Sequence, residues 1–60
     1  MTLSDLYFTN NDWEKTTVLK IDVIASNKTE KLTAYKSLIM YSDYEVVGFT
    51  SNWVVLRASD

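Results

Sequence analysis

Residues 16 to 25, TTVLKIDVIA, carry the strongest secondary-structure signal in the chain. Apolar side chains recur at every second position, which is the period of a strand with one face against a core. That face comprises Leu19, Ile21, Val23 and Ala25. The opposite face has a charged middle and apolar ends, formed by Val18, Lys20, Asp22 and Ile24. A strand that is apolar on both faces needs cover on both sides.

Two more strands are predicted at residues 44–50 and 53–58, with Ser51-Asn52 as the turn of a hairpin. Alternation places one set of side chains towards the core: Val47, Phe49, Val54, Leu56 and Ala58. The opposite faces carry Tyr44, Val46 and Gly48, and then Trp53, Val55 and Arg57. Gly48 inside a strand indicates a bulge or the close approach of another chain.

The N-terminal residues predict a short helix from Leu3 to Phe8, because Leu3, Leu6 and Tyr7 share one helical face. Thr2 is placed to accept a hydrogen bond from the first turn, and Asp5 to interact favourably with the helix dipole. The run Asn10–Asp12 favours a turn and is expected to end this helix.

Residues 30–42 admit two interpretations after a turn at residues 26–29. Residues 31–36 can form the return strand of a hairpin, followed by a short helix at 37–42. Alternatively, residues 30–41 can form one helix capped by Thr29, with Leu32, Tyr35 and Ile39 on one stripe. The stripe is poor because other apolar residues surround it, so the hairpin is favoured.

These elements predict an α+β fold in a single domain spanning residues 1–60. We expect a small antiparallel sheet of three to four strands, a short N-terminal helix and a second short helix. A chain of this length buries only about 60% of the surface that it exposes when unfolded. Because there is no Cys for disulfides and no His for metal binding, oligomerisation is the remaining way to support so small a core.

The composition argues against an enzyme and against any cofactor or metal site. Nucleophilic catalysis normally pairs Ser or Cys with His, and the chain has neither Cys nor His. Asp43 and Glu45 are the best carboxylate pair, but a chain of 60 residues has little volume for a catalytic pocket. One glycine is too few for a phosphate-binding loop.

The surplus of apolar side chains on the strands predicts a protein-interaction module and favours a homodimer. The candidate interface residues are Val18, Ile24, Tyr44, Val46, Trp53 and Val55. Trp13 lies among polar residues and is either a satellite part of the core or a contact to a partner protein. Phe49 and Tyr7 are expected in the core.

Charge distribution makes nucleic acid the weaker partner hypothesis. Five of the six basic residues lie between residues 15 and 36, yet the net charge is −2 and that segment contains no Arg. No secretory signal and no apolar run long enough to span a membrane is visible, so we expect a cytoplasmic protein without membrane contact.

The sequence resembles short phage or prophage α+β proteins of Gram-positive hosts. The residues that carry the resemblance are Leu3-Ser4-Asp5-Leu6, Lys20-Ile21-Asp22-Val23, Glu45-Val46-Val47-Gly48-Phe49 and Trp53-Val54-Val55-Leu56. The resemblance implies a protein that binds and inhibits or redirects a host protein, antiviral defence systems among them. Alternative functions are a small nucleic-acid-binding regulator and a structural or assembly protein.

Overall fold

Two helices and four strands make up the fold of the computed structural model, which describes residues 1–9 and 13–58. The elements are α1 (Leu3–Thr9), β1 (Val18–Val23), the 3-10 turn η1 (Ile24–Ser26), β2 (Lys28–Thr33), α2 (Ala34–Tyr41), β3 (Glu45–Phe49) and β4 (Trp53–Arg57). The predicted α+β class is confirmed.

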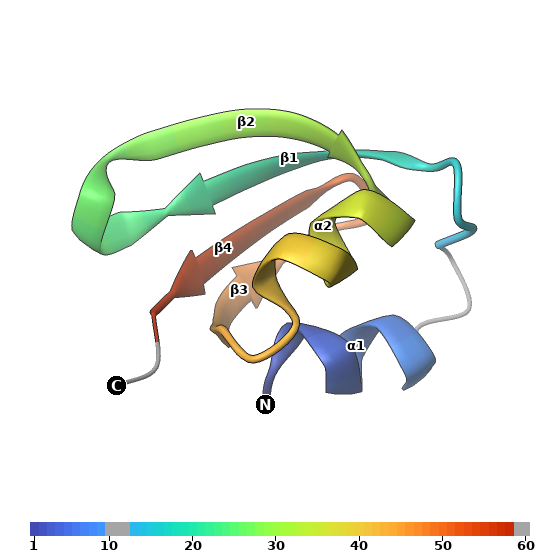
Figure 1. Cartoon of the computed structure of the whole chain (residues 1–60), viewed down its shortest axis with the longest axis horizontal. Coiled ribbons are helices and arrows are strands. Elements are labelled where there is room, and N and C mark those ends of the chain that lie inside the picture. The colour runs from blue at the N-terminus through green and yellow to red at the C-terminus, as the bar shows by residue number, and fades with distance from the viewer. Residues whose placement is uncertain (10–12, 59–60) are drawn as a thin grey trace.

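The four strands form one mixed sheet in the order β2-β1-β4-β3 (Figure 1). β1 pairs with β2 and β3 pairs with β4 in antiparallel hairpins, but β1 and β4 run parallel. The expectation of a purely antiparallel sheet was therefore wrong at its central pair. Side-chain alternation predicts a strand and its buried face, but it does not say which strand lies beside it.

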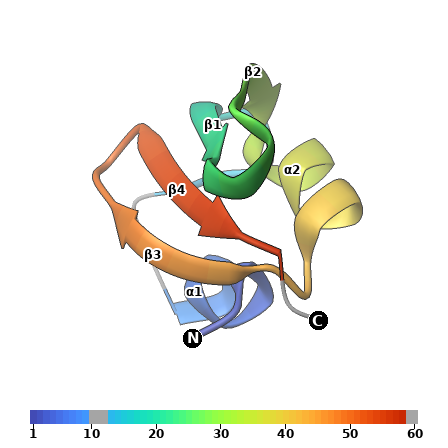
Figure 2. The same ribbon diagram turned by 90° about the vertical axis from the view of Figure 1, so that its left-hand side faces the viewer.

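Both helices lie on the same face of the sheet (Figure 2). α2 contacts β1 and β2, α1 contacts β3, and the two helices contact each other. The core fills the space between the helices and the sheet. Its most buried apolar members are Leu3, Leu19, Ile21, Ala34, Val54 and Leu56, with Leu6, Trp13, Val23 and Tyr41 around them.

The start of α1 is fixed by a reciprocal cap. The Asp5 N–H donates to Thr2 Oγ1, and the Thr2 N–H donates to Asp5 Oδ2, both at 3.2 Å. Each bond satisfies a backbone donor that the first turn leaves without a helical partner. The predicted helix and its cap at Thr2 are confirmed, whereas the predicted stop at residues 10–12 lies outside the described residues.

The hairpin interpretation of residues 30–42 is confirmed, with boundaries shifted towards the N-terminus. β2 begins at Lys28, directly after Asn27, which adopts the left-handed conformation (φ 52°) that closes the turn. α2 begins at Ala34, three residues earlier than expected, because Thr33 caps it by accepting a hydrogen bond from the Lys36 N–H.

A β-bulge in β3 overturns part of the predicted face assignment. Val46 pairs with Leu56 but Gly48 pairs with Val55, so Val47 is an extra residue between them. The bulge shifts the alternation by one position. Val46 therefore packs against the core, whereas Val47 is exposed.

Two aromatic residues near this strand also differ from expectation. Tyr44 packs against the core, where its ring meets Tyr41 edge-on at 4.9 Å between centroids. Phe49 pairs with the buried Val54 and so keeps its place on the core side, but it is half exposed at the rim. Tyr7 packs against the core as expected.

Candidate interaction face

The side of the sheet that faces away from both helices has no covering layer among the described residues (Figure 2). We call this surface the outer face. The strand register brings its side chains together from β1, β2 and β4. They are Val18, Lys20, Asp22, Thr29, Lys31, Trp53 and Val55, with Ile24 of η1 at one end.

Four of the six predicted interface residues lie on the outer face. Val18, Ile24 and Trp53 are 58%, 48% and 38% exposed, and Val55 is half-buried beside Trp53. The prediction was wrong for the other two, Tyr44 and Val46. Both pack against the core, Val46 because of the bulge in β3 and Tyr44 at the start of that strand. They belong to the fold and not to this surface.

Trp53 is held in place by a hydrogen-bond network on the outer face. Its indole Nε1 donates to Asp22 Oδ2 at 2.7 Å, and the Thr29 hydroxyl donates to Asp22 Oδ1 at 2.7 Å. Both hydrogen bonds stabilise the carboxylate and so lower the pKa of Asp22 below its ordinary value. The bond from Thr29 has the larger effect and the bond from Trp53 the smaller. The aromatic ring is thus fixed although it is partly exposed.

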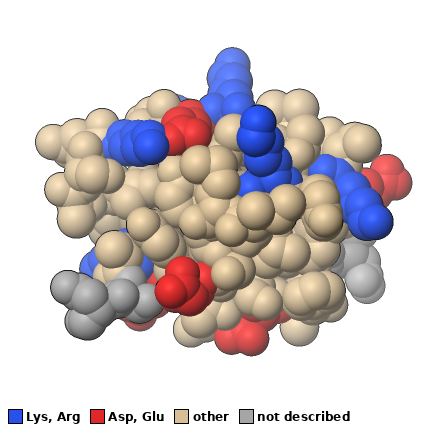
Figure 3. All heavy atoms as spheres, viewed as in Figure 1, with Lys and Arg blue, Asp and Glu red and all other residues tan. Residues whose placement is uncertain are grey.

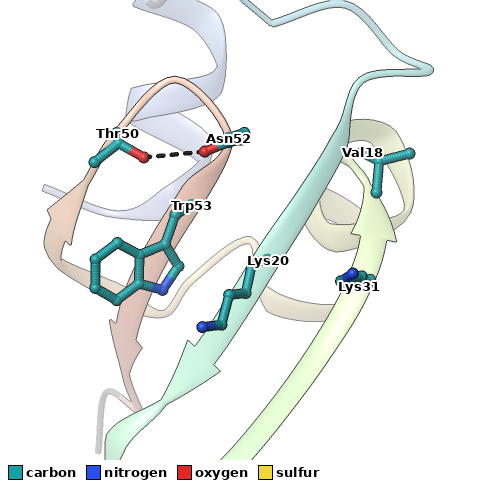
Figure 4. A pocket seen from close by; sticks show the side chains of 6 residues that line it. All are labelled: Val18, Lys20, Lys31, Thr50, Asn52 and Trp53. Atoms are coloured by element: carbon teal, nitrogen blue, oxygen red, sulfur yellow. Dashed lines mark hydrogen bonds between the residues drawn. The ribbon is translucent and has the colours of Figure 1, made fainter.

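Two hollows flank Trp53 on the outer face. The larger, of about 470 Å³, is lined by Val18, Lys20, Lys31, Thr50, Asn52 and Trp53 (Figure 4). In that view the Lys20 side chain reaches towards the Trp53 ring, and a hydrogen bond joins Thr50 to Asn52 at the rim. The smaller, of about 340 Å³, lies at the Ile24 end with Asp22, Thr29 and Val55 in its lining.

Basic side chains are unevenly distributed over the molecule. In Figure 3 most of them lie over the half of the molecule that contains the β1–β2 hairpin and α2. Within the described part of the chain, Lys28 forms an ion pair with Glu30, and Arg57 forms one with Glu45. The Lys28 hydrogen bond lowers the pKa of Glu30, and the Arg57 hydrogen bond lowers that of Glu45. Lys20 and Lys31 take part in neither ion pair.

Trp13 belongs to the core and not to an exposed contact surface. It is 7% exposed, its Nε1 donates to the Ser51 carbonyl at 2.8 Å, and its ring meets Phe49 edge-on. Trp13 therefore joins the segment before β1 to the β3–β4 turn. Of the two interpretations of Trp13, the structure agrees with the core interpretation.

The helical side carries exposed apolar side chains that the sequence analysis did not select. Ile39 and Met40 on α2 and Phe8 on α1 are all exposed. Only the rejected single-helix interpretation placed Ile39 on a buried stripe. Lys31 and Thr29 were also missed as members of the outer face, because their position depends on the β1–β2 register rather than on local sequence.

Neither a metal centre nor a membrane span is found in the described ranges 1–9 and 13–58. No three acidic side chains there lie close enough together to hold a metal ion, and neither helix is long and apolar enough to cross a membrane. Comparison with protein-family models, curated proteins and solved structures finds no match to this chain.

Proposed function

We propose that this protein is a non-catalytic interaction module that binds another protein through the outer face of its sheet. The observation that carries the proposal is the uncovered outer face, which presents Val18, Ile24 and Val55 together with a tryptophan held by Asp22. Full burial of an exposed valine or isoleucine side chain is worth about 1.5–3 kcal/mol, and each of these partly exposed side chains contributes less. Partly exposed tryptophans held in one orientation are favoured interface anchors, because little rotamer entropy remains to be lost on binding.

The size of the outer face suits a small protein interface. The three strands that form it are spaced about 4.8 Å apart and are each about 17 Å long, which gives a projected surface of roughly 250 Å². This is below the ~800 Å² per partner of a standard interface. We therefore propose modest affinity for a partner that contacts this face alone.

A second copy of the chain is the first partner to test, and we propose that it forms a two-fold dimer at high concentration. Wild-type protein at about 50 µM should elute, by size-exclusion chromatography with light scattering, at about twice the 6.9 kDa of one chain. Val18→Glu places a charge on the outer face and should give monomers. Ile39→Glu is a matched control, because Ile39 is similarly exposed (65%) but lies on α2.

Circular dichroism of all three proteins should be the same, which separates loss of contact from loss of fold. A monomeric wild type at 50 µM would remove the dimer proposal. A dimer that Val18→Glu leaves intact and Ile39→Glu disrupts would move the contact surface to the helical side.

Nucleic-acid binding is a second candidate function, favoured by Lys20 beside the Trp53 ring and by Lys31 in the same hollow. Lysines can contact phosphates while an aromatic ring stacks on a base. Among the described residues of the outer face, two lysines lie outside the ion pairs, and Asp22 lies between Trp53 and Thr29. Because stable binding to single strands usually neutralises several phosphates, protein remains the favoured partner.

The resemblance to short phage proteins adds a proposal about the biological role. A host protein would be the partner, and occupation of its surface would block or redirect it. A structural or assembly role uses the same contact face without inhibition.

A further inference from the structure

We propose that the larger hollow on the outer face is a recognition site for an acidic segment of a partner protein, with Lys20 and Lys31 binding its carboxylates and Trp53 packing against its apolar side chains. This inference rests on the proposed function, since it uses the same face, and it adds the chemistry of the partner. The partner is a protein other than a second copy of this chain.

The first observation is that Lys20 and Lys31 lie directly opposite each other on β1 and β2. The Ala34 N–H donates to the Thr17 carbonyl at 2.7 Å, so residues 17 and 34 form a hydrogen-bonded pair just beyond the register of the two strands. Bonded and non-bonded pairs alternate in antiparallel ladders, which makes Lys20 and Lys31 a non-bonded pair. Side chains approach each other most closely in such pairs.

Like charges directly opposite each other are destabilising in a sheet, and neither lysine forms an ion pair with another described residue. The nearby Asp22 accepts hydrogen bonds from Thr29 and Trp53 on its two oxygens and interacts with Lys20 electrostatically, without a direct ion pair. Lys20 is instead placed over the Trp53 ring, with its ammonium 5.5 Å from the centroid. Both lysines line the same hollow, Lys20 beside the Trp53 ring and Lys31 on the neighbouring strand (Figure 4), so an acidic segment lying across it would meet a positive charge on each strand.

The second observation is that the walls of this hollow are suited to a peptide. Val18 and the Trp53 ring provide apolar surface on two sides, and Thr50 and Asn52 provide polar groups at the rim. The Trp53 ring is already oriented by Asp22 before a ligand arrives. A segment with carboxylates in its centre and apolar residues on either side complements these walls in both charge and polarity.

The salt dependence of binding distinguishes an acidic partner from a second copy of the chain. Lys20 and Lys31 outnumber Asp22 on the outer face, and Arg57 is matched by Glu45. Two stacked copies would bring like charges together, so self-association should strengthen with added salt. Binding to an acidic segment should weaken with added salt, because exposed charges are screened over about 10 Å at 0.1 M.

The test uses fluorescein-labelled peptides of 12 residues with two central Glu flanked by Leu or Phe, titrated with the full chain at 20 mM salt. Fluorescence anisotropy should show saturable binding. Replacing both Glu by Gln, or adding 300 mM salt, should weaken binding at least tenfold. Lys20→Gln and Lys31→Gln should each weaken it at least fivefold, whereas Lys36→Gln, which changes an exposed lysine on α2, should leave it unchanged.

Three results would overturn the inference: no peptide binds, the Gln peptides bind as well as the Glu peptides, or the lysine variants bind as well as wild type. Tighter binding of a 12-nucleotide oligothymidylate, lost in the same lysine variants, would assign the site to nucleic acid instead. If no peptide binds but the chain forms a dimer that Val18→Glu disrupts, this inference is wrong and the proposed function is still supported.

Discussion

Asp22 shows how one side chain can organise a surface. Its two carboxylate oxygens accept from Thr29 and Trp53, which lie on β2 and β4, so a residue of β1 links three strands. Neither partner is near Asp22 in sequence, and sequence alternation alone placed Asp22 simply on a polar face. Its role depends on the register of both strand pairs, in which Thr29 and Val55 lie opposite Asp22.

The ionisation of Asp22 gives a prediction at this scale. Because the pKa of Asp22 is lowered in the folded protein, its contribution to stability is present above the ordinary value of 3.8 and is lost as the pH falls through the folded pKa. Thr29→Val removes the largest cause, so the Asp22 pKa should move up towards 3.8. Carboxyl carbon NMR titration measures it directly.

A matched variant controls for a general effect of removing a hydroxyl. Thr16→Val changes a threonine that precedes β1 and should leave the Asp22 titration unchanged. Equal Asp22 pKa values in wild type and Thr29→Val would mean that the hydrogen bond from Thr29 is not maintained in solution.

At the scale of elements, the two edges of the sheet are protected in different ways. The N-terminal residues cover the start of β3: the Val46 N–H donates to the Met1 carbonyl at 2.8 Å, and Thr2 bridges to Glu45. β2 is the other edge strand, and its lysines make pairing with a further strand unfavourable. The bulge at Val47 adds a local twist to β3 that also discourages edge pairing.

Gly48 in that bulge gives a prediction for β3. Its φ is not positive, and a Cβ built on it meets no atom within 4 Å, so nothing in the described structure requires glycine there. Gly48→Ala should stabilise the fold by about 0.5–1 kcal/mol, because alanine loses less backbone entropy on folding. Thermal unfolding should show a rise of about 2–8 °C. A lower melting temperature would show that the bulge needs the freedom of glycine.

Sequence patterns predicted α1, β1, β3 and β4 and favoured a strand followed by a helix within residues 30–42, but they did not predict how these elements combine. The cap at Thr2 and the core positions Leu19, Ile21, Val54 and Leu56 follow from local spacing, and all are confirmed. The faces of β3 were misassigned because one inserted residue reverses the alternation, and Gly48 indicated a bulge without locating it. For such non-local reasons, two of the six candidate residues, Tyr44 and Val46, left the surface, and Thr29 and Lys31 were missed.

For the whole molecule, the parallel pair β1–β4 is the structural centre. Each of these strands has a neighbour on both sides, and Leu19, Ile21, Val54 and Leu56 on them are fully buried. The hairpins β1–β2 and β3–β4 meet at this pair, at the contact of β4 with η1 and through the helices that pack beneath them. Disruption of the central pair should therefore unfold the domain as one unit.

Amide hydrogen exchange tests this order of stability. The amides of Ile21 and Val54 should exchange slowest, because both residues are fully buried in the central strands. On β2, the amides of Thr29 and Lys31 should exchange faster than those of Glu30 and Leu32, because strand alternation directs them to the free edge. Equal protection along β2 in a monomeric sample would indicate that another segment covers that edge.

The two tryptophans, described above as part of the core and part of the outer face, also divide the optical signal of the protein. Trp13 is almost completely enclosed, whereas Trp53 stands partly in water at the surface where a partner would bind. Indole emission shifts to longer wavelength as the ring meets water, so the two rings should emit at different wavelengths. The shorter-wavelength emission of Trp13 should follow folding, and the longer-wavelength emission of Trp53 should follow binding of a partner to the outer face, so one titration of the unlabelled chain would report both events.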